Sequence, residues 1–179
     1  DQLDVVLACL RLVGALELRP RVVLGAVDER ESTWALALDV ALGLINEEGL
    51  DRVYERHAIL ARAARAGIEA MGLERFGPEN DGANVLTAAR LPDSIDGAAV
   101  PKLMRDRYGV TAAGGQARLK GKIVRIAHCG YYGAYDIVIA LSALESALRD
   151  AGAEVEPGGA AGAAQRVFAE AGRAPEPVV

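Results

Sequence analysis

The stretch GGQARLKGKIVRIAHCGYYGAYD, residues 114–136, is the part of the sequence on which the predicted fold depends most. At its centre, residues 122–128 have the apolar composition of a buried strand, yet Arg125 stands between two apolar pairs. Arginine is almost never fully buried unless an anion pairs with it. Two alternatives follow: an internal ion pair with an Asp or Glu of the protein, or a guanidinium that binds the carboxylate of a ligand.

Two adjacent glycines, Gly114 and Gly115, precede this strand. Such a pair is compatible with an ordinary turn, and it also lets a ligand approach the backbone closely. The presence of Gln116 and Arg125 beside them favours the second use, because the planar guanidinium binds a carboxylate through two parallel hydrogen bonds. Gly114, Gly115, Gln116 and Arg125 are therefore the candidate substrate-binding residues.

Hydrophobic periodicity predicts the other elements, with helical spacing in some segments and alternation in others. Pro101 is tolerated only in the first turn of a helix, so the helix before Tyr108 is expected to begin near Val100. The predicted helices cover 32–48, 50–71, 100–108, 135–150 and 163–171, and the predicted strands cover 84–91, 109–115 and 122–128. This order indicates an α/β protein with α+β character: a small, mostly antiparallel sheet covered by helices.

The composition excludes several classes of function. The chain has 179 residues and a net charge of −5, with no basic stripe, which argues against nucleic acid as a partner. The apolar stretch at 4–18 is interrupted by Arg11 within about ten residues, whereas a membrane span needs roughly 20. It is predicted to be a buried strand or helix. Two cysteines, Cys9 and Cys129, suit a reducing compartment and predict a cytoplasmic protein.

The histidines and the second cysteine have mainly structural interpretations. His57 lies on the apolar side of a predicted helix, and one histidine alone makes no ligand set. Strand alternation is expected to turn His128 to the face opposite Arg125, which makes a direct role for it the less favoured alternative. Cys129 is predicted to be a small buried thiol. The sequence has no phosphate loop, zinc-ligand spacing or nucleophile elbow, so no metal site is predicted.

Two long strings resemble the C-terminal part of class V aminotransferases, which are pyridoxal-phosphate enzymes of the alanine–glyoxylate and serine–pyruvate transaminase type. They are GLINEEGLDRVYERHAILARAARAGIEAMGLERF and YGVTAAGGQARLKGKIVRIAHCGYYGAYDIVIALSALESAL, and the resemblance covers about 36–151. It implies a segment 1–31 of uncertain assignment, an aminotransferase-like small domain at 32–152 and an Ala/Gly/Pro-rich tail at 153–179. It also implies that Arg125 holds the substrate α-carboxylate.

The resemblance also implies what this chain lacks. In the family a lysine of the large domain forms a Schiff base with the cofactor. Lys102, Lys120 and Lys122 do not have the surroundings of that lysine. The family's phosphate-binding threonine has no clear counterpart in DERESTW, residues 28–34, although Thr33 is a weak candidate. The pyridoxal 5'-phosphate is therefore expected not to be held covalently by this chain.

The function expected from the resemblance is amino transfer between a small amino acid, of the alanine or serine type, and a 2-oxo acid such as glyoxylate or pyruvate. This chain alone is expected to be inactive, as a truncated part of the enzyme. The expected assembly is a homodimer or an association with a large-domain chain, since the family builds its sites from two subunits. The alternative is a non-catalytic carboxylate-binding or interaction module, either a pseudoenzyme or a remnant. A cysteine desulfurase is less well supported, because no flexible Ser/Gly-rich loop surrounds Cys129.

Overall fold

The structure is a computed structural model that describes residues 29–78, 82–172 and 175–177. These residues belong to two compact units, one that ends at Val53 and one that runs from Tyr54 to Pro177. The apolar stretch predicted at 4–18 and Cys9 lie outside the described residues.

The elements follow in the order α2 (Glu29–Glu48), α3 (Leu50–Ala70), β1 (Leu86–Arg90), α4 (Val100–Tyr108), β2 (Ala113–Gly114), the 3-10 turn η2 (Ala117–Leu119), β3 (Ile123–Ala127), α5 (Ala134–Asp150) and α6 (Gly159–Glu170). The predicted fold class is confirmed: a small antiparallel sheet with helices packed against it. The start predicted for α4 is also confirmed, with Pro101 in its first turn. β2 is only two residues long, whereas the sequence predicted a strand over 109–115.

Helix α2 begins three residues earlier than predicted. Ser32 and Thr33 therefore lie inside the helix, because the preceding Glu-Arg-Glu segment consists of good helix formers. The helical spacing predicted for its apolar residues is present, but these side chains are not buried. Leu38 is 60% exposed and Leu42 is 50% exposed. The apolar spacing thus predicted the helix correctly but did not predict that these apolar side chains are exposed.

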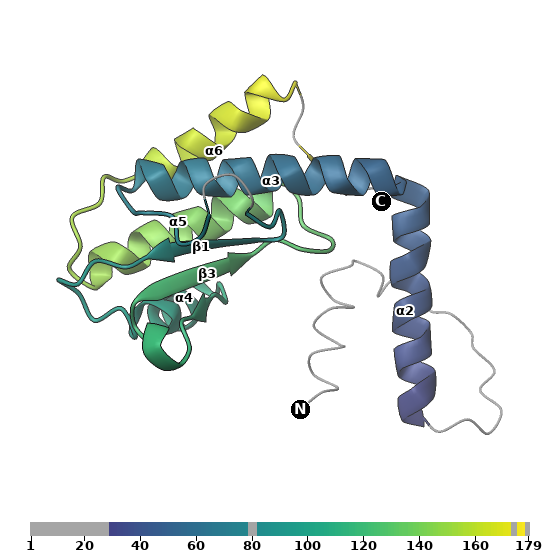
Figure 1. Cartoon of the computed structure of the whole chain (residues 1–179), viewed down its shortest axis with the longest axis horizontal. Helices are drawn as coiled ribbons and strands as arrows, with labels where there is room; N and C mark the ends of the chain where they lie inside the picture. Colours follow the sequence, from purple (N-terminus) through teal and green to yellow (C-terminus); the bar gives the residue numbers. More distant parts are fainter. Residues whose placement is uncertain (1–28, 79–81, 173–174, 178–179) are drawn as a thin grey trace. The chain divides into compact units, whose positions relative to one another are not determined.

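The sheet has the strand order β1-β3-β2, and both pairings are antiparallel. The central strand β3 pairs with β1 along its whole length, and Figure 1 shows these two strands side by side. Arg125, in the middle of β3, lies opposite Ala88 of β1 and Ala113 of β2. The chain segment before β1 adds one more bridge, between Arg75 and Ala89.

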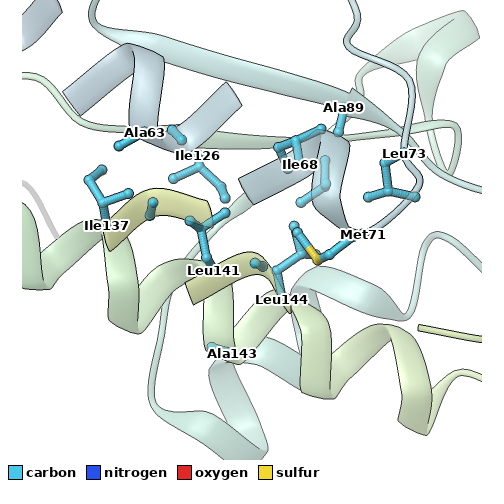
Figure 2. Packing of buried hydrophobic residues seen from close by; sticks show 14 of the residues in the cluster. Ala63, Ile68, Met71, Leu73, Ala89, Ile126, Ile137, Leu141, Ala143 and Leu144 are labelled. Carbon is cyan, nitrogen blue, oxygen red and sulfur yellow. The ribbon is translucent and has the colours of Figure 1, made fainter. Parts of the chain in front are cut away.

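One face of the sheet is buried against helices. Successive side chains of a strand point to opposite faces, so Ala89, Val124 and Ile126 all point into the core. Figure 2 shows Ala89 and Ile126 together with side chains of α3 and α5. We call this side the covered face. Burying large apolar side chains stabilises a fold by about 1.5–3 kcal/mol each, so this cluster supplies most of the stabilisation.

Close packing of α3 against α5 depends on a glycine. A Cβ atom added at Gly67 of α3 would clash with the side chain of Leu141, which is fully buried on α5. A larger residue at this position would separate the two helices or force Leu141 out of its rotamer, which typically costs about 1–3 kcal/mol. The short side chain at position 67 therefore sets the distance between the helices that cover the sheet.

Helix α6 lies in the region predicted to be a tail and packs against α5. It begins at Gly159, four residues before the predicted start, and its Phe168 is buried in the core. The buried carboxylate of Glu145 accepts hydrogen bonds from the backbone N–H groups of Gly158, at 2.6 Å, and Ala160, at 3.2 Å. An anionic acceptor is favourable there, because the first N–H groups of a helix have no partner within the helix.

Across the three described ranges of the chain, no helix combines the length and the apolar character needed to cross a membrane.

Candidate functional site

Arg125 projects from the side of the sheet opposite the covered face. Its neighbours Val124 and Ile126 are 1% and 5% exposed, whereas Arg125 is only partly buried. The same alternation places Ala88 and Ala113, its cross-strand partners, on this second side. We call the side that carries Ala88, Arg125 and Ala113 the open face. An arginine can therefore stand in this apolar strand, because its side chain points away from the core that Val124 and Ile126 enter.

The guanidinium of Arg125 has one hydrogen bond to the protein. Its Nε donates to the backbone carbonyl oxygen of Gly114, with a distance of 3.1 Å between the two atoms. In the parts of the chain that the structure describes, no Asp or Glu pairs with Arg125 and its terminal nitrogens have no hydrogen-bond partner. Of the two alternatives left open by the sequence, the internal ion pair is therefore not found. The bond to Gly114 instead limits rotation of the guanidinium while leaving its terminal nitrogens available.

The loop that follows β2 has a tight backbone. Gly115 donates its N–H to the carbonyl of Ile123 at 3.1 Å, and a Cβ added at Gly115 would clash with the carbonyl group of Leu119. Gln116 is exposed and begins the 3-10 turn. Ala117 has a φ of +46°, a left-handed conformation that non-glycine residues seldom adopt. The structure thus brings Gly114 into contact with Arg125, whereas it uses Gly115 for close backbone packing and leaves Gln116 at the surface.

Sequence analysis missed a second arginine site on the covered side, at the loop between β3 and α5. The buried Arg56 of α3 donates from Nη1 to the carbonyl oxygens of Gly130, at 3.0 Å, and Tyr132, at 2.7 Å. The adjacent His57 accepts a hydrogen bond from the N–H of Gly130 at its Nε2, at 3.1 Å. Two consecutive residues of α3 therefore fix the loop. The structural role expected for His57 agrees with this geometry, and the arginine-histidine pair at 56–57 was the signal in the sequence.

His128 lies on the covered side, as strand alternation predicted. It is 0% exposed, and its Nε2 lies 2.9 Å from the hydroxyl of Thr87. Burial is the main cause that lowers the pKa of His128 to about 4, the nearby His57 and Arg65 act in the same direction, and a backbone hydrogen bond of Asn84 acts in the opposite one. The ring is therefore neutral at neutral pH. It shares no face of the sheet with Arg125, so a direct role in binding a substrate carboxylate is not supported.

The prediction for Cys129 is wrong. The thiol is exposed, whereas the sequence suggested a buried one. The reason is that β3 ends at Ala127 and the buried position after it is taken by His128, which turns the next side chain outwards.

Thr33 and the three lysines do not assemble with Arg125 in the described residues. Thr33 belongs to α2, and its side chain lies outside the described part of the structure. Lys102, Lys120 and Lys122 are all exposed. A lysine that forms a Schiff base at neutral pH needs a lowered pKa, which burial or a neighbouring cation produces. The exposure of these three side chains does not fit that requirement.

Among the described residues of the unit that contains the sheet, two hollows are lined by residues other than Arg125. One, of about 390 Å³, is lined by Gly72, Leu73, Glu74, Arg90, Leu91, Pro92, Asp93 and Lys122. The other, of about 420 Å³, is lined by Tyr108, Ser146, Arg149, Asp150, Ala153, Glu154 and Val155. Small-molecule sites usually bury most of their ligand in a concave pocket. These two hollows therefore provide no walls for a site at Arg125.

Known proteins resemble about two thirds to three quarters of this chain. No family model matches the sequence. The chain is 41% identical over 123 residues to an uncharacterised aminotransferase of Methanocaldococcus jannaschii, covering 69% of this chain and 32% of that protein. It is also 41% identical over 123 residues to the pyridoxamine–pyruvate transaminase of Mesorhizobium japonicum, covering 68% of this chain and 31% of that protein. The crystal structure of the ureidoglycine–glyoxylate aminotransferase of Bacillus subtilis superposes with a TM-score of 0.73 at 36% identity, covering 76% of this chain and 36% of that one.

This chain belongs to the class V aminotransferases. It matches their C-terminal part and spans about a third of the length of the relatives it matches. The resemblance inferred from the 108–148 string is thereby confirmed, and so is the fold expected from it.

Proposed function

We propose that this chain contributes the carboxylate-binding side of an aminotransferase site, and that Arg125 binds the α-carboxylate of the amino acid or 2-oxo acid. The proposal rests on the hydrogen bonding of the Arg125 guanidinium. Its Nε is held by the carbonyl of Gly114 at 3.1 Å, and its terminal nitrogens have no partner in the described residues. Two terminal N–H groups in one plane match the two oxygens of a carboxylate, and such charge-assisted pairs are about twice as strong as neutral hydrogen bonds.

The proposed reaction is amino transfer between a small amino acid and glyoxylate or pyruvate. The names of the relatives support this substrate class: they include a pyridoxamine–pyruvate transaminase, serine–glyoxylate aminotransferases and an ureidoglycine–glyoxylate transaminase. Glyoxylate and pyruvate each carry one carboxylate, which suits a site with a single available arginine. Gly114 acts in this proposal by orienting Arg125. The assignments of Gly115 and Gln116 to the substrate site stay predictions.

The family's cofactor is pyridoxal 5'-phosphate, which when bound supplies the electron sink for amino transfer. The described residues of this chain do not fit a covalent cofactor site, because Lys102, Lys120 and Lys122 are all exposed. We therefore assign the covalent attachment to a part of the protein other than these residues. Contact of Thr33 with the cofactor phosphate stays a prediction.

Exposed apolar side chains on two separate helices, together with the matched length, support association with another polypeptide segment. Leu38 and Leu42 of α2 and Ile139 of α5 are between 50% and 60% exposed, and Tyr135 of α5 is 71% exposed. Exposed apolar patches commonly mark interaction sites. We propose that a large domain, in the same chain or in a partner, covers some of these side chains, within a homodimer as in the family. The domain limits at 32–152 and the cytoplasmic location stay predictions.

The alternative function is a carboxylate-binding module without catalysis. The exposed lysines favour it, since a module needs Arg125 but no Schiff base. The two functions differ in what a longer protein containing this chain does with pyridoxal phosphate. An aminotransferase forms an imine that borohydride fixes at one lysine, and it transfers an amino group. A module binds the carboxylate and does neither.

The carboxylate site is tested by titrating the 179-residue chain with pyruvate and following amide signals by NMR. We expect weak, saturable binding that Arg125→Met lowers at least about tenfold, because about 1.4 kcal/mol of charge-assisted hydrogen bonding is lost. Arg90→Met is the matched control, since Arg90 is an arginine of the same sheet that already pairs with Glu74 at 3.2 Å. Equal affinity in wild type and Arg125→Met would refute the proposal.

A further inference from the structure

The open face places a row of four side chains across the sheet. Arg125 lies opposite Ala88 on one side and Ala113 on the other. Beyond Ala88, the bridge between Arg75 and Ala89 places Phe76 opposite Ala88, and the Phe76 N–H donates to the Ala88 carbonyl at 2.8 Å. In order across the sheet, the row therefore consists of Phe76, Ala88, Arg125 and Ala113. The arginine is flanked by methyl groups, and the aromatic ring stands on one side only.

The two sides of Arg125 differ in how much space they leave. On the β1 side, Ala88 is partly buried, and the guanidinium carbon of Arg90 lies 5.0 Å from the centre of the Phe76 ring. These bulky groups limit the space at the Phe76 end of the row. On the other side, β2 is an edge strand and Ala113 is exposed. Space for a ligand is therefore greatest over β2.

The hydrogen bond of Arg125 also lies on the β2 side. Its Nε reaches the carbonyl of Gly114, which belongs to β2, so the guanidinium is drawn towards that strand. Adjacent strands lie about 4.8 Å apart, and directly opposite Cβ atoms lie about 4.5–5.5 Å apart. A carboxylate on the terminal nitrogens therefore brings its α-carbon close to the methyl group of Ala113.

From this geometry we propose that Ala113 is the specificity-determining residue of the carboxylate site: its single methyl group sets how large a substituent the bound 2-oxo acid can carry on its carbonyl carbon. The inference rests on the proposed function of Arg125. Alanine is the smallest side chain that still covers the strand backbone, so it admits acids with branched as well as unbranched substituents. A larger residue at 113 occupies the volume next to the arginine and excludes the larger acids first.

The test compares pyruvate with 3-methyl-2-oxobutanoate, an acid with the same oxo-carboxylate head and a branched substituent. For the wild-type chain we expect the two affinities to lie within a few-fold of each other in NMR titrations. For Ala113→Leu we expect a loss of about tenfold for the branched acid and a clearly smaller loss for pyruvate, the size of effect that one or two methylene groups produce in a pocket.

Ala127→Leu is the matched control, because Ala127 is an exposed alanine on the open face of the same strand as Arg125 and faces Leu86 instead. It should leave the ratio of the two affinities unchanged. Equal losses for both acids in Ala113→Leu, or no loss for either, would overturn the assignment of Ala113 while leaving the carboxylate site intact. Binding that is insensitive to Arg125→Met would instead show that the proposed function itself is wrong.

Discussion

The covered and open faces of one sheet treat their polar residues in opposite ways. On the covered side, His128 is fully buried beside Thr87, and Arg56 uses its guanidinium to hold two backbone carbonyls of the following loop. On the open face, the one hydrogen bond that Arg125 makes within the described residues goes to Gly114. A polar group removed from water is usually hydrogen-bonded within the protein, whereas a partly exposed group can keep its capacity for a ligand. The buried Nδ1 of His128 departs from this rule, since it has no hydrogen-bond partner in the described residues.

The hydrogen bonds of Arg56 and Arg125 distinguish a structural arginine from a binding arginine. Arg56 is 6% exposed and its contacts with Gly130 and Tyr132 join α3 to the loop after β3. For Arg125, the hydrogen bond to Gly114 orients the guanidinium but leaves its terminal nitrogens without a partner in the described residues. Residue type and position in an element do not distinguish the two, but the number of satisfied donors does.

The largest expected effect concerns pH and the covered face. Because His128 has a pKa of about 4 in the folded protein and about 6.5 when unfolded, folding favours its neutral form. The neutral ring of His128 therefore contributes fully to the free energy of unfolding above pH 6.5. This contribution, about 3 kcal/mol at most, is lost as the pH falls from 6.5 to 4. Urea denaturation at a series of pH values measures this loss.

The control for this prediction is the double variant Thr87→Val, His128→Leu, which removes both partners of the buried pair at once. Replacing both partners by apolar groups is often close to neutral at pH 7. The variant should lose most of the wild-type decline between pH 6.5 and 4. An unchanged decline would assign the pH dependence to other groups.

The second prediction compares the two arginines directly. Arg56→Met should lower the free energy of unfolding by about 2 kcal/mol or more, because it leaves the carbonyls of Gly130 and Tyr132 without their charged donor. Arg125→Met should lower it by less than about 1 kcal/mol, since one hydrogen bond at a partly exposed site is lost. Guanidinium unfolding of both variants measures the difference. Equal losses would mean that Arg125 is as structural as Arg56.

The sequence predicted most of this fold because local signals were strong. Pro101 located the start of α4, and alternation along β3 separated Arg125 from His128. Local signals failed where a distant segment decides the outcome. The contact of Arg56 with Gly130 joins residues 74 positions apart, and the row through Ala88 and Ala113 follows from strand register. Neither can be found by periodicity along a single segment.

The smallest expected effect lies in the loop beside the open face. Ala117 has a φ of +46°, so Ala117→Gly should relieve left-handed strain of about 1 kcal/mol, partly offset by the greater entropy of glycine in the unfolded chain. The net result should be a stabilisation of a few tenths of a kcal/mol. Ala171→Gly, at a residue with a φ of −72°, is the control and should destabilise. The midpoint of thermal unfolding measures the change in stability of each variant. Destabilisation of similar size in the two variants would contradict the strained conformation of Ala117.

The most direct measurement is an NMR titration of the chain with pyruvate, observing the side-chain nitrogens of its arginines. We expect the terminal nitrogen signals of Arg125 to shift and saturate with pyruvate, while those of Arg56 stay unchanged. If amide signals elsewhere respond to pyruvate and the Arg125 side chain does not, then the carboxylate binds at another place and the central claim is wrong.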